Sequence, residues 1–283
     1  MVADGATVLV NQEVTADYLT GRRVYKTLSL LIAGSAGIPV PPFLLLLNEN
    51  AEALTSFAGQ WSTPLMLRVD YGRLPARKPI GGVAVHRIET MGRLCQFILA
   101  QGCYPLIHPD IDRFSDVYSC GVILTLKDLD AELEFVGEGF DAGDLRRGTS
   151  VPHEKMRLAL PSRTLKEHSV IDQETYELER RRRARYSAAL GQYTQELNRL
   201  GRARAAISVP RSGPLRAKDL ERIPARYERV PSSILNSLIP LIETIKFRVL
   251  STLPSSSVYV ASFSYLPNRT WVLWDIYGQW YRR

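Results

Sequence analysis

The feature that most constrains the fold is a run of twenty residues without a charge, Leu28–Leu47. Its length would allow a helix to span a bilayer. Three prolines between residues 39 and 42 interrupt it, and proline removes a helical hydrogen bond and clashes with the preceding turn. The sequence therefore predicts a helix that ends near Ala33, a turn, and a buried strand over residues 43–47, with no membrane partner.

The composition is that of a globular intracellular protein. Of 283 residues, 45% are hydrophobic and 23% are charged, which excludes disorder of the whole chain. The three cysteines match neither a zinc-binding spacing nor a disulfide framework. The printed sequence opens without a basic and then apolar leader. We therefore expect a cytoplasmic location, where thiols stay reduced.

The pattern of secondary structure indicates a mixed fold. Helical spacing of apolar residues and short apolar runs bounded by Gly and Pro alternate along the chain. Strands followed by helices favour an α/β or α+β fold. Helices are predicted over residues 48–60, 88–100, 173–204 and 232–249, and strands over residues 65–69, 83–86, 104–108, 117–126, 132–136, 257–265 and 270–277.

The positive charge is concentrated in one segment. The chain carries a net charge of +7, and residues 174–229 hold fourteen Lys and Arg against seven Asp and Glu. The predicted helix over residues 173–204 contains most of the consecutive arginines, so Arg180–Arg185 could bind a polyanion such as a nucleic acid. Glutamates one turn upstream give the alternative of a solvated helix with internal ion pairs.

Two elements of the first hundred residues suit phosphate binding. Arg68 ends a predicted buried strand, where ligands of mixed sheets commonly bind. Lys78 precedes the pair Gly81-Gly82, whose backbone N–H groups could close on phosphate oxygens. The alternatives are an ion pair between Arg68 and Asp70 and an ordinary hairpin turn at the glycines.

These residues resemble the ATP-grasp superfamily. Lys26 followed by Gly37–Phe43 (GIPVPPF) is similar to the nucleotide-binding part of pyruvate phosphate dikinase and phosphoenolpyruvate synthase, and Arg68 and the segment from Lys78 to Val83 match further elements. The resemblance implies a two-lobed body with ATP in a cleft between the lobes. We place the lobes at residues 1–103 and 104–283, with Lys26, Arg68, Lys78, Gly81 and Gly82 on the phosphates and Asp110 on the ribose.

The resemblance also implies Mg²⁺, with a departure from the family pattern. The family places metal-binding side chains on two adjacent strands near the end of the domain. Here the last predicted strand offers Asp275, and the strand before it has no acid. Magnesium prefers carboxylates together with phosphate oxygens. We therefore expect Asp275 to bind the metal with help from a loop residue, Asp144.

The predicted loop over residues 137–153 is dense in reactive side chains. Arg146 and Arg147 could form a fork on a carboxylate or phosphate, and His153 could move a proton. We assign these three residues to the acceptor substrate. The alternative is a loop whose acids and arginines satisfy one another.

The sequence therefore predicts an enzyme that uses ATP for phosphoryl transfer or for carboxylate-amine ligation. Its acceptor, a small molecule or a protein, is not identified by any motif. Two alternatives stay open: a non-catalytic protein that binds nucleic acid or a partner through the arginine-rich helix, and a nucleotide-binding relative that has lost catalysis.

Overall fold

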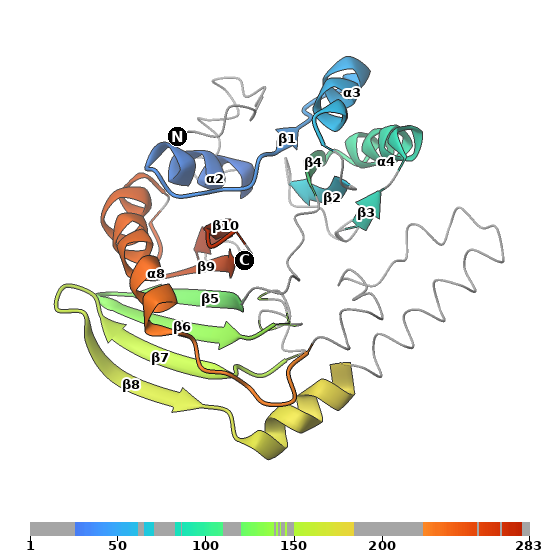
Figure 1. Ribbon diagram of the computed structural model, residues 1–283. Coiled ribbons are helices and arrows are strands. Elements are labelled where there is room, and N and C mark those ends of the chain that lie inside the picture. The colour runs from blue at the N-terminus through green and yellow to red at the C-terminus, as the bar shows by residue number, and fades with distance from the viewer. Residues whose placement is uncertain are drawn as a thin grey trace. The chain divides into compact units, whose positions relative to one another are not determined.

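The computed structural model in Figure 1 shows two compact units, one with the described residues up to Pro109 and one with those from Cys120 onward. All described strand pairs are antiparallel, so the α+β class is confirmed and the α/β alternative with parallel strands is not. The structure describes residues 26–61, 65–70, 83–85, 87–109, 120–138, 140, 142, 145, 150–183, 223–253, 255–266 and 268–278.

A four-stranded antiparallel sheet forms the centre of the first unit, in the order β1-β4-β2-β3. Leu67 of β2 lies opposite Val83 of β3 and opposite Ile107 of β4. Because β4 pairs along the whole of β2, the first unit extends beyond the expected boundary at residue 103. The strands are β1 (Leu44–Leu45), β2 (Leu65–Asp70), β3 (Val83–Val85) and β4 (Tyr104–Pro109).

Two helices cover one face of this sheet, α3 (Ala51–Gly59) and α4 (Ile88–Ala100). Asn50 caps α3, and its side chain accepts a hydrogen bond from the Ala53 N–H at 2.8 Å. The core between the helices and the sheet is built from buried apolar side chains, among them Leu54, Phe57, Leu65, Leu67, Val69, Met91, Cys95, Ile98 and Ile107.

The uncharged run folds as a helix, a turn and a short strand. Helix α2 (Lys26–Ser35) ends before Gly37, whose φ of 88° lies in the left-handed region that glycine adopts without strain. The Ile38 N–H donates to the Ala33 carbonyl at 3.0 Å and closes the helix end. Within the described part of the chain, each helix is too short or too polar to cross a bilayer.

The second unit is built on a six-stranded antiparallel sheet in the order β10-β9-β5-β6-β7-β8. The strands predicted at residues 117–126 and 132–136 are present as neighbours, and those predicted at residues 257–265 and 270–277 form a hairpin. The hairpin of β7 and β8 was not predicted. The strands are β5 (Cys120–Lys127), β6 (Asp130–Val136), β7 (Glu154–Ala159), β8 (Thr164–Val170), β9 (Val258–Tyr265) and β10 (Trp271–Gly278).

A long helical segment packs against this sheet. It comprises α8 (Ser232–Thr244), a π-helix η2 (Ile245–Val249) and a 3₁₀ turn η3 (Leu250–Thr252), and its buried side chains follow helical spacing. Trp271 of β10 donates its indole N–H to the Ser237 hydroxyl at 2.9 Å. A buried indole needs such a partner, so this bond sets α8 on the sheet.

Candidate functional site

The two faces of β2 differ in chemistry. Leu65, Leu67 and Val69 point into the core beneath α3 and α4. Since side chains alternate along a strand, Arg68 and Asp70 lie together on the other face. Arg68 is half-buried, and Asp70 is fully buried.

Asp70 connects β2 to the beginning of α2. Its carboxylate accepts hydrogen bonds from the Thr27 backbone N–H, at 2.8 Å, and from the Thr27 hydroxyl. The first N–H groups of a helix have no partner within the helix, and their partial positive charge favours a carboxylate. The contact therefore brings the first turn of α2, which begins at Lys26, next to the strand that carries Arg68. Two of the predicted phosphate-binding residues thus belong to elements in direct contact.

Most of the other predicted site residues lie outside the described residues. These are Lys78, Gly81, Gly82, Asp110, Asp144, Arg146 and Arg147, and their assignment to ATP, to the metal or to the acceptor stays a prediction. Of Lys26 the structure describes the backbone position alone.

Asp275 lies in the middle of β10, opposite Ser262 of β9. The Asp275 side chain is 2% exposed and accepts a hydrogen bond from the Ser262 hydroxyl. The pairing of the two strands is irregular between Leu273 and Asp275, and the Trp274 indole N–H donates to the Ser264 hydroxyl at 2.9 Å. Carboxylate and hydroxyl oxygens are hard donors that suit Mg²⁺. Within the described chain, however, no three acidic, His or Cys side chains gather closely enough to hold a metal.

His153 has a different setting from the one predicted. Its side chain is fully buried, and its ring makes edge contacts with Phe140, Tyr176 and Tyr227, with centroids 4.5, 5.0 and 5.2 Å away. Nδ1 accepts the Gly137 N–H at 3.1 Å, which places the proton of the neutral ring on Nε2.

Burial lowers the pKa of His153 to about 3, so the ring stays neutral at physiological pH. Within the described residues Nε2 has no hydrogen-bond partner. Among the described residues, three aromatic side chains thus surround the ring. This setting suits a structural role beside the small aromatic core of this unit, and the role in proton transfer stays a prediction.

A buried carboxylate that the sequence did not reveal lies beside this core. Glu154 of β7 is 1% exposed, and its Oε2 accepts hydrogen bonds from the Tyr227 hydroxyl at 3.0 Å and from the Val230 N–H at 2.9 Å. Its Oε1 lies 2.7 Å from Nε2 of His168 on β8. Tyr227 and Val230 thus connect the sheet to the segment over residues 223–230, which leads into α8, and His168 holds the carboxylate from the neighbouring strand. The distance in sequence between Glu154 and Val230 explains why no local pattern indicated the contact.

The arginine-rich helix begins as predicted, with Asp172 as its cap. The Asp172 carboxylate accepts from the Thr175 N–H at 2.8 Å, and the helix runs over residues 173–183 to the limit of this described segment. Arg180 pairs with Glu177 at 3.0 Å and donates to the Ile223 carbonyl at 3.1 Å. These contacts occupy Arg180 within the fold, which agrees with the alternative of internal ion pairs.

Arg182 also has an internal partner, Glu179, at 3.6 Å. Arg181 and Arg182 are exposed. Binding of a polyanion at Arg180–Arg185 stays a prediction, and residues 184 and 185 lie outside the described residues.

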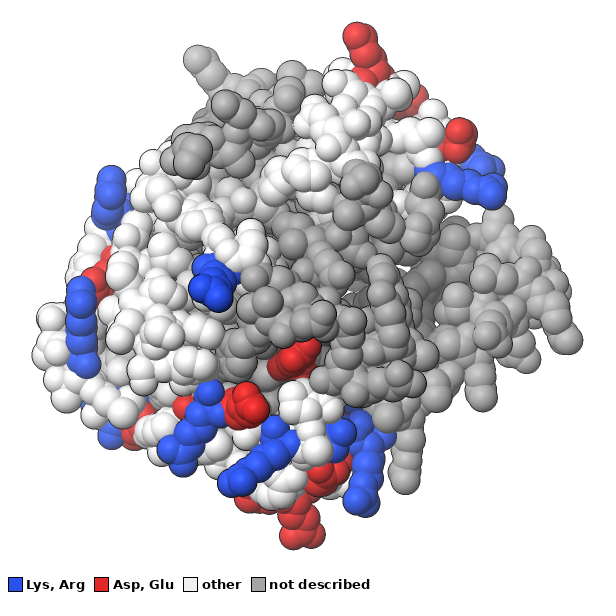
Figure 2. Space-filling model, viewed as in Figure 1, with Lys and Arg blue, Asp and Glu red and all other residues white. Residues whose placement is uncertain are grey.

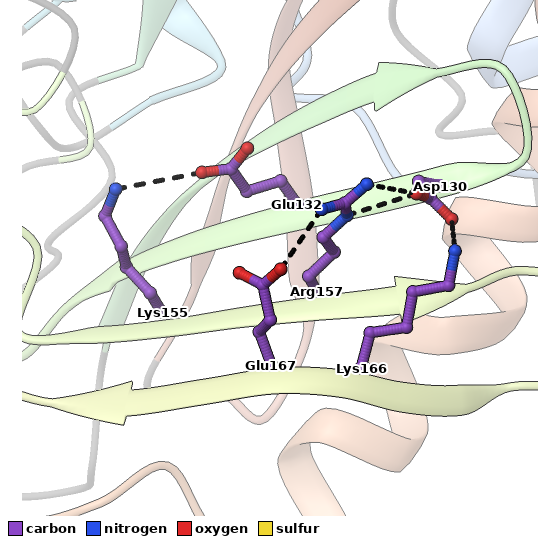
Figure 3. Close-up of polar contacts among 6 residues, drawn as sticks. All are labelled: Asp130, Glu132, Lys155, Arg157, Lys166 and Glu167. Carbon is purple, nitrogen blue, oxygen red and sulfur yellow. Dashed lines mark hydrogen bonds and ion pairs between the residues drawn. The ribbon is translucent and has the colours of Figure 1, made fainter.

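Charged side chains cover one face of the sheet over β6, β7 and β8 (Figure 3). Arg157 bonds to Asp130 at 2.7 Å and to Glu167 at 3.1 Å, and Lys166 bonds to Asp130 at 2.6 Å. Hydrogen bonds from Lys166 and Arg157 hold the pKa of Asp130 below its usual value. Figure 2 shows basic and acidic side chains intermixed on the face in view. The described cations and anions on β6, β7 and β8 thus pair with one another. This face of the sheet therefore lacks the single sign of charge that attracts a polyanion.

Comparison with known proteins finds similarity at the level of structure alone. No family model matches the sequence, and no curated protein matches it. An N5-carboxyaminoimidazole ribonucleotide synthetase in its ADP complex aligns with a TM-score of 0.44 and 9% identity, over 92% of this chain and 46% of that chain.

Two further solved structures align to a similar extent. A D-alanine-D-alanine ligase from Coxiella burnetii has a TM-score of 0.43 and 10% identity, over 94% of this chain and 49% of that chain. The D-cycloserine synthetase DcsG has a TM-score of 0.41 and 11% identity, over 90% of this chain and 61% of that chain. The chain thus spans about half the length of the first two structures. The activities in these names are those of the matched proteins.

Proposed function

We propose that this protein binds ATP in the manner of ATP-grasp enzymes and uses it for carboxylate-amine ligation or phosphoryl transfer. The observation that carries the proposal is the contact of Asp70 with Thr27, which joins the α2 terminus beginning at Lys26 to the strand of Arg68. The reaction class comes from the resemblance of Lys26, Gly37–Phe43, Arg68 and the segment from Lys78 to Val83 to the ATP-grasp superfamily.

The electrostatics of this part of the first unit suit an anionic ligand. Arg68 is a half-buried cation on the strand that contacts the first turn of α2. The Asp70 carboxylate is already engaged by Thr27. A phosphate would gain from the Arg68 guanidinium, which presents paired N–H donors to phosphate oxygens.

The metal would be held in the second unit. We propose Asp275 as a Mg²⁺ ligand, supported by its oxygen chemistry and by the adjacent Ser262 hydroxyl. Bound Mg²⁺ would neutralise phosphate charge during transfer. Asp144 remains the proposed second ligand, and Arg146 and Arg147 remain the residues proposed for the acceptor.

Calorimetric titration with ATP tests the proposal. Arg68→Ala should weaken ATP binding by about tenfold or more, since hydrogen bonds to charged groups contribute about 1.5–3 kcal/mol. Arg93→Ala, which removes an exposed arginine from α4 of the same unit, is the matched control and should bind ATP as the wild type does. Absence of binding heat in the wild type, or equal affinity of the Arg68 variant, would contradict the proposal.

A second measurement separates an enzyme from a relative that has lost catalysis. ATP turnover is followed with and without Mg²⁺ in the wild type and in Asp275→Asn. An active enzyme requires the metal and loses most of its turnover in this variant. If the wild type binds ATP but hydrolyses none of it with or without Mg²⁺, the protein is a nucleotide-binding relative that has lost catalysis.

A further inference from the structure

The contact between Asp70 and Thr27 crosses 43 positions of sequence. Asp70 is the last residue of β2, Thr27 is the second residue of α2, and both side chains are fully buried. A buried carboxylate without donors is costly, so this one is held where the helix supplies its N–H and hydroxyl. The contact therefore ties the first turn of α2 to the end of β2.

Two residues of the proposed phosphate site lie next to this contact, one on α2 and one on β2. Lys26 immediately precedes Thr27 along α2, and Arg68 lies two residues before Asp70 on the same face of β2. A shift of the helix terminus would displace the backbone of Lys26 relative to Arg68. Charged groups bind a phosphate chain well when they are held in place before the ligand arrives.

We infer that Asp70 is a positioning residue for nucleotide binding: it holds the first turn of α2, with Lys26, in register with Arg68. The inference rests on the proposed function. Asp70 acts through its neighbours, because its carboxylate is buried and carries the same sign of charge as a phosphate. Its removal is therefore expected to weaken binding of the phosphate chain in addition to any loss of stability.

The experiment compares variants that disturb this contact with one that disturbs only the core. Asp70→Asn removes the charge, and Thr27→Val removes the hydroxyl donor while leaving the backbone N–H. Leu54→Ala opens the core under α3, on the opposite face of the sheet, and controls for lost stability. Folding of each full-length variant is checked by circular dichroism before titration with ATP and with AMP, which lacks the β- and γ-phosphates.

The expected result is a graded loss that is specific to the phosphate chain. Asp70→Asn weakens ATP binding by about tenfold, and Thr27→Val weakens it by less. AMP binding changes little in either variant, and Leu54→Ala keeps the ATP affinity of the wild type. Where Asp70→Asn does not fold, Thr27→Val alone decides.

Two outcomes are distinguishable. A wild-type protein that binds no ATP removes the proposed function and this inference with it. A wild-type protein that binds ATP, with Asp70→Asn and Thr27→Val no weaker than Leu54→Ala, leaves the function intact and overturns the inference. Equal losses for ATP and AMP would also overturn it, because a positioning effect on Lys26 and Arg68 must depend on the phosphate chain.

Discussion

Replacing Glu154 should strongly destabilise the second unit. The carboxylate is 1% exposed and has donors in Tyr227, Val230 and His168 at 3.0, 2.9 and 2.7 Å. A hydrogen bond to a charged group contributes about 1.5–3 kcal/mol, and a neutral one about 0.5–1.5 kcal/mol. Glu154→Gln keeps the shape but loses the charge in all three bonds.

The magnitude follows from these differences. A loss of about 1 kcal/mol in each of three bonds gives roughly 3 kcal/mol, and the lower cost of burying an amide offsets part of it, so we expect about 2–3 kcal/mol. Glu154→Leu leaves the donors without an acceptor and should cost about 3–5 kcal/mol. The control is Glu167→Gln on the neighbouring strand, whose side chain is 70% exposed. Its ion pair with Arg157 should contribute less than about 1 kcal/mol.

The assay is urea unfolding at neutral pH, followed by tryptophan fluorescence and by circular dichroism. Trp271 and Trp274 belong to the second unit and report on it. Hydrogen exchange at the Val230 amide gives the local effect, and its protection should fall in both Glu154 variants. A Glu154→Gln variant within about 0.5 kcal/mol of the wild type, or no more affected than Glu167→Gln, would refute the argument that this carboxylate holds residues 223–230 on the sheet.

The remaining predictions concern a histidine and a glycine. Because burial lowers the pKa of His153 from 6.5 to about 3, the unfolded chain binds one proton more between these values. Stability is therefore full above pH 6.5 and declines by up to about 1.4 kcal/mol per pH unit as the pH falls towards 3. His153→Asn keeps an acceptor for the Gly137 N–H and should flatten this decline, measured by urea unfolding between pH 7 and 5. If the free energy of unfolding falls with pH as steeply as in the wild type, His153 is not the group responsible. Gly121→Ala should lower the free energy of unfolding by about 1–3 kcal/mol, because its Cβ would lie 2.7 Å from the Ala142 backbone N. A variant as stable as the wild type in urea unfolding would show that residue 121 and the Ala142 backbone are less closely packed than this.

Elements with a strong local pattern could be predicted from the sequence. Helices α3 and α4 have apolar residues at helical spacing and a capping Asn50 or a clear glycine boundary. The hairpin of β7 and β8 was missed because β8 is an exposed edge strand whose residues, TLKEHSV, show no alternation of polar and apolar side chains. Its place in the sheet depends on pairing with β7.

The candidate site residues also differ in how far a local sequence pattern indicates them. Arg68 is a candidate from the sequence alone, because a cation at the end of an apolar run has a local signature, and its role stays a prediction. The setting of His153 could not be predicted, because a histidine near glycines and acids has the same sequence pattern whether it faces solvent or an aromatic core. Burial decides its chemistry, and burial comes from residues as distant as Tyr227.

The sequence by itself determined the local choices: where proline ends a helix, where glycine permits a turn, and where charge gathers along the chain. These depend on backbone sterics and on neighbours within a few residues. The tertiary structure alone decided which carboxylates are buried and what they contact. Asp70 reaches Thr27 across 43 positions and Glu154 reaches Val230 across 76, and both carboxylates are buried because elements distant in sequence pack around them and exclude water.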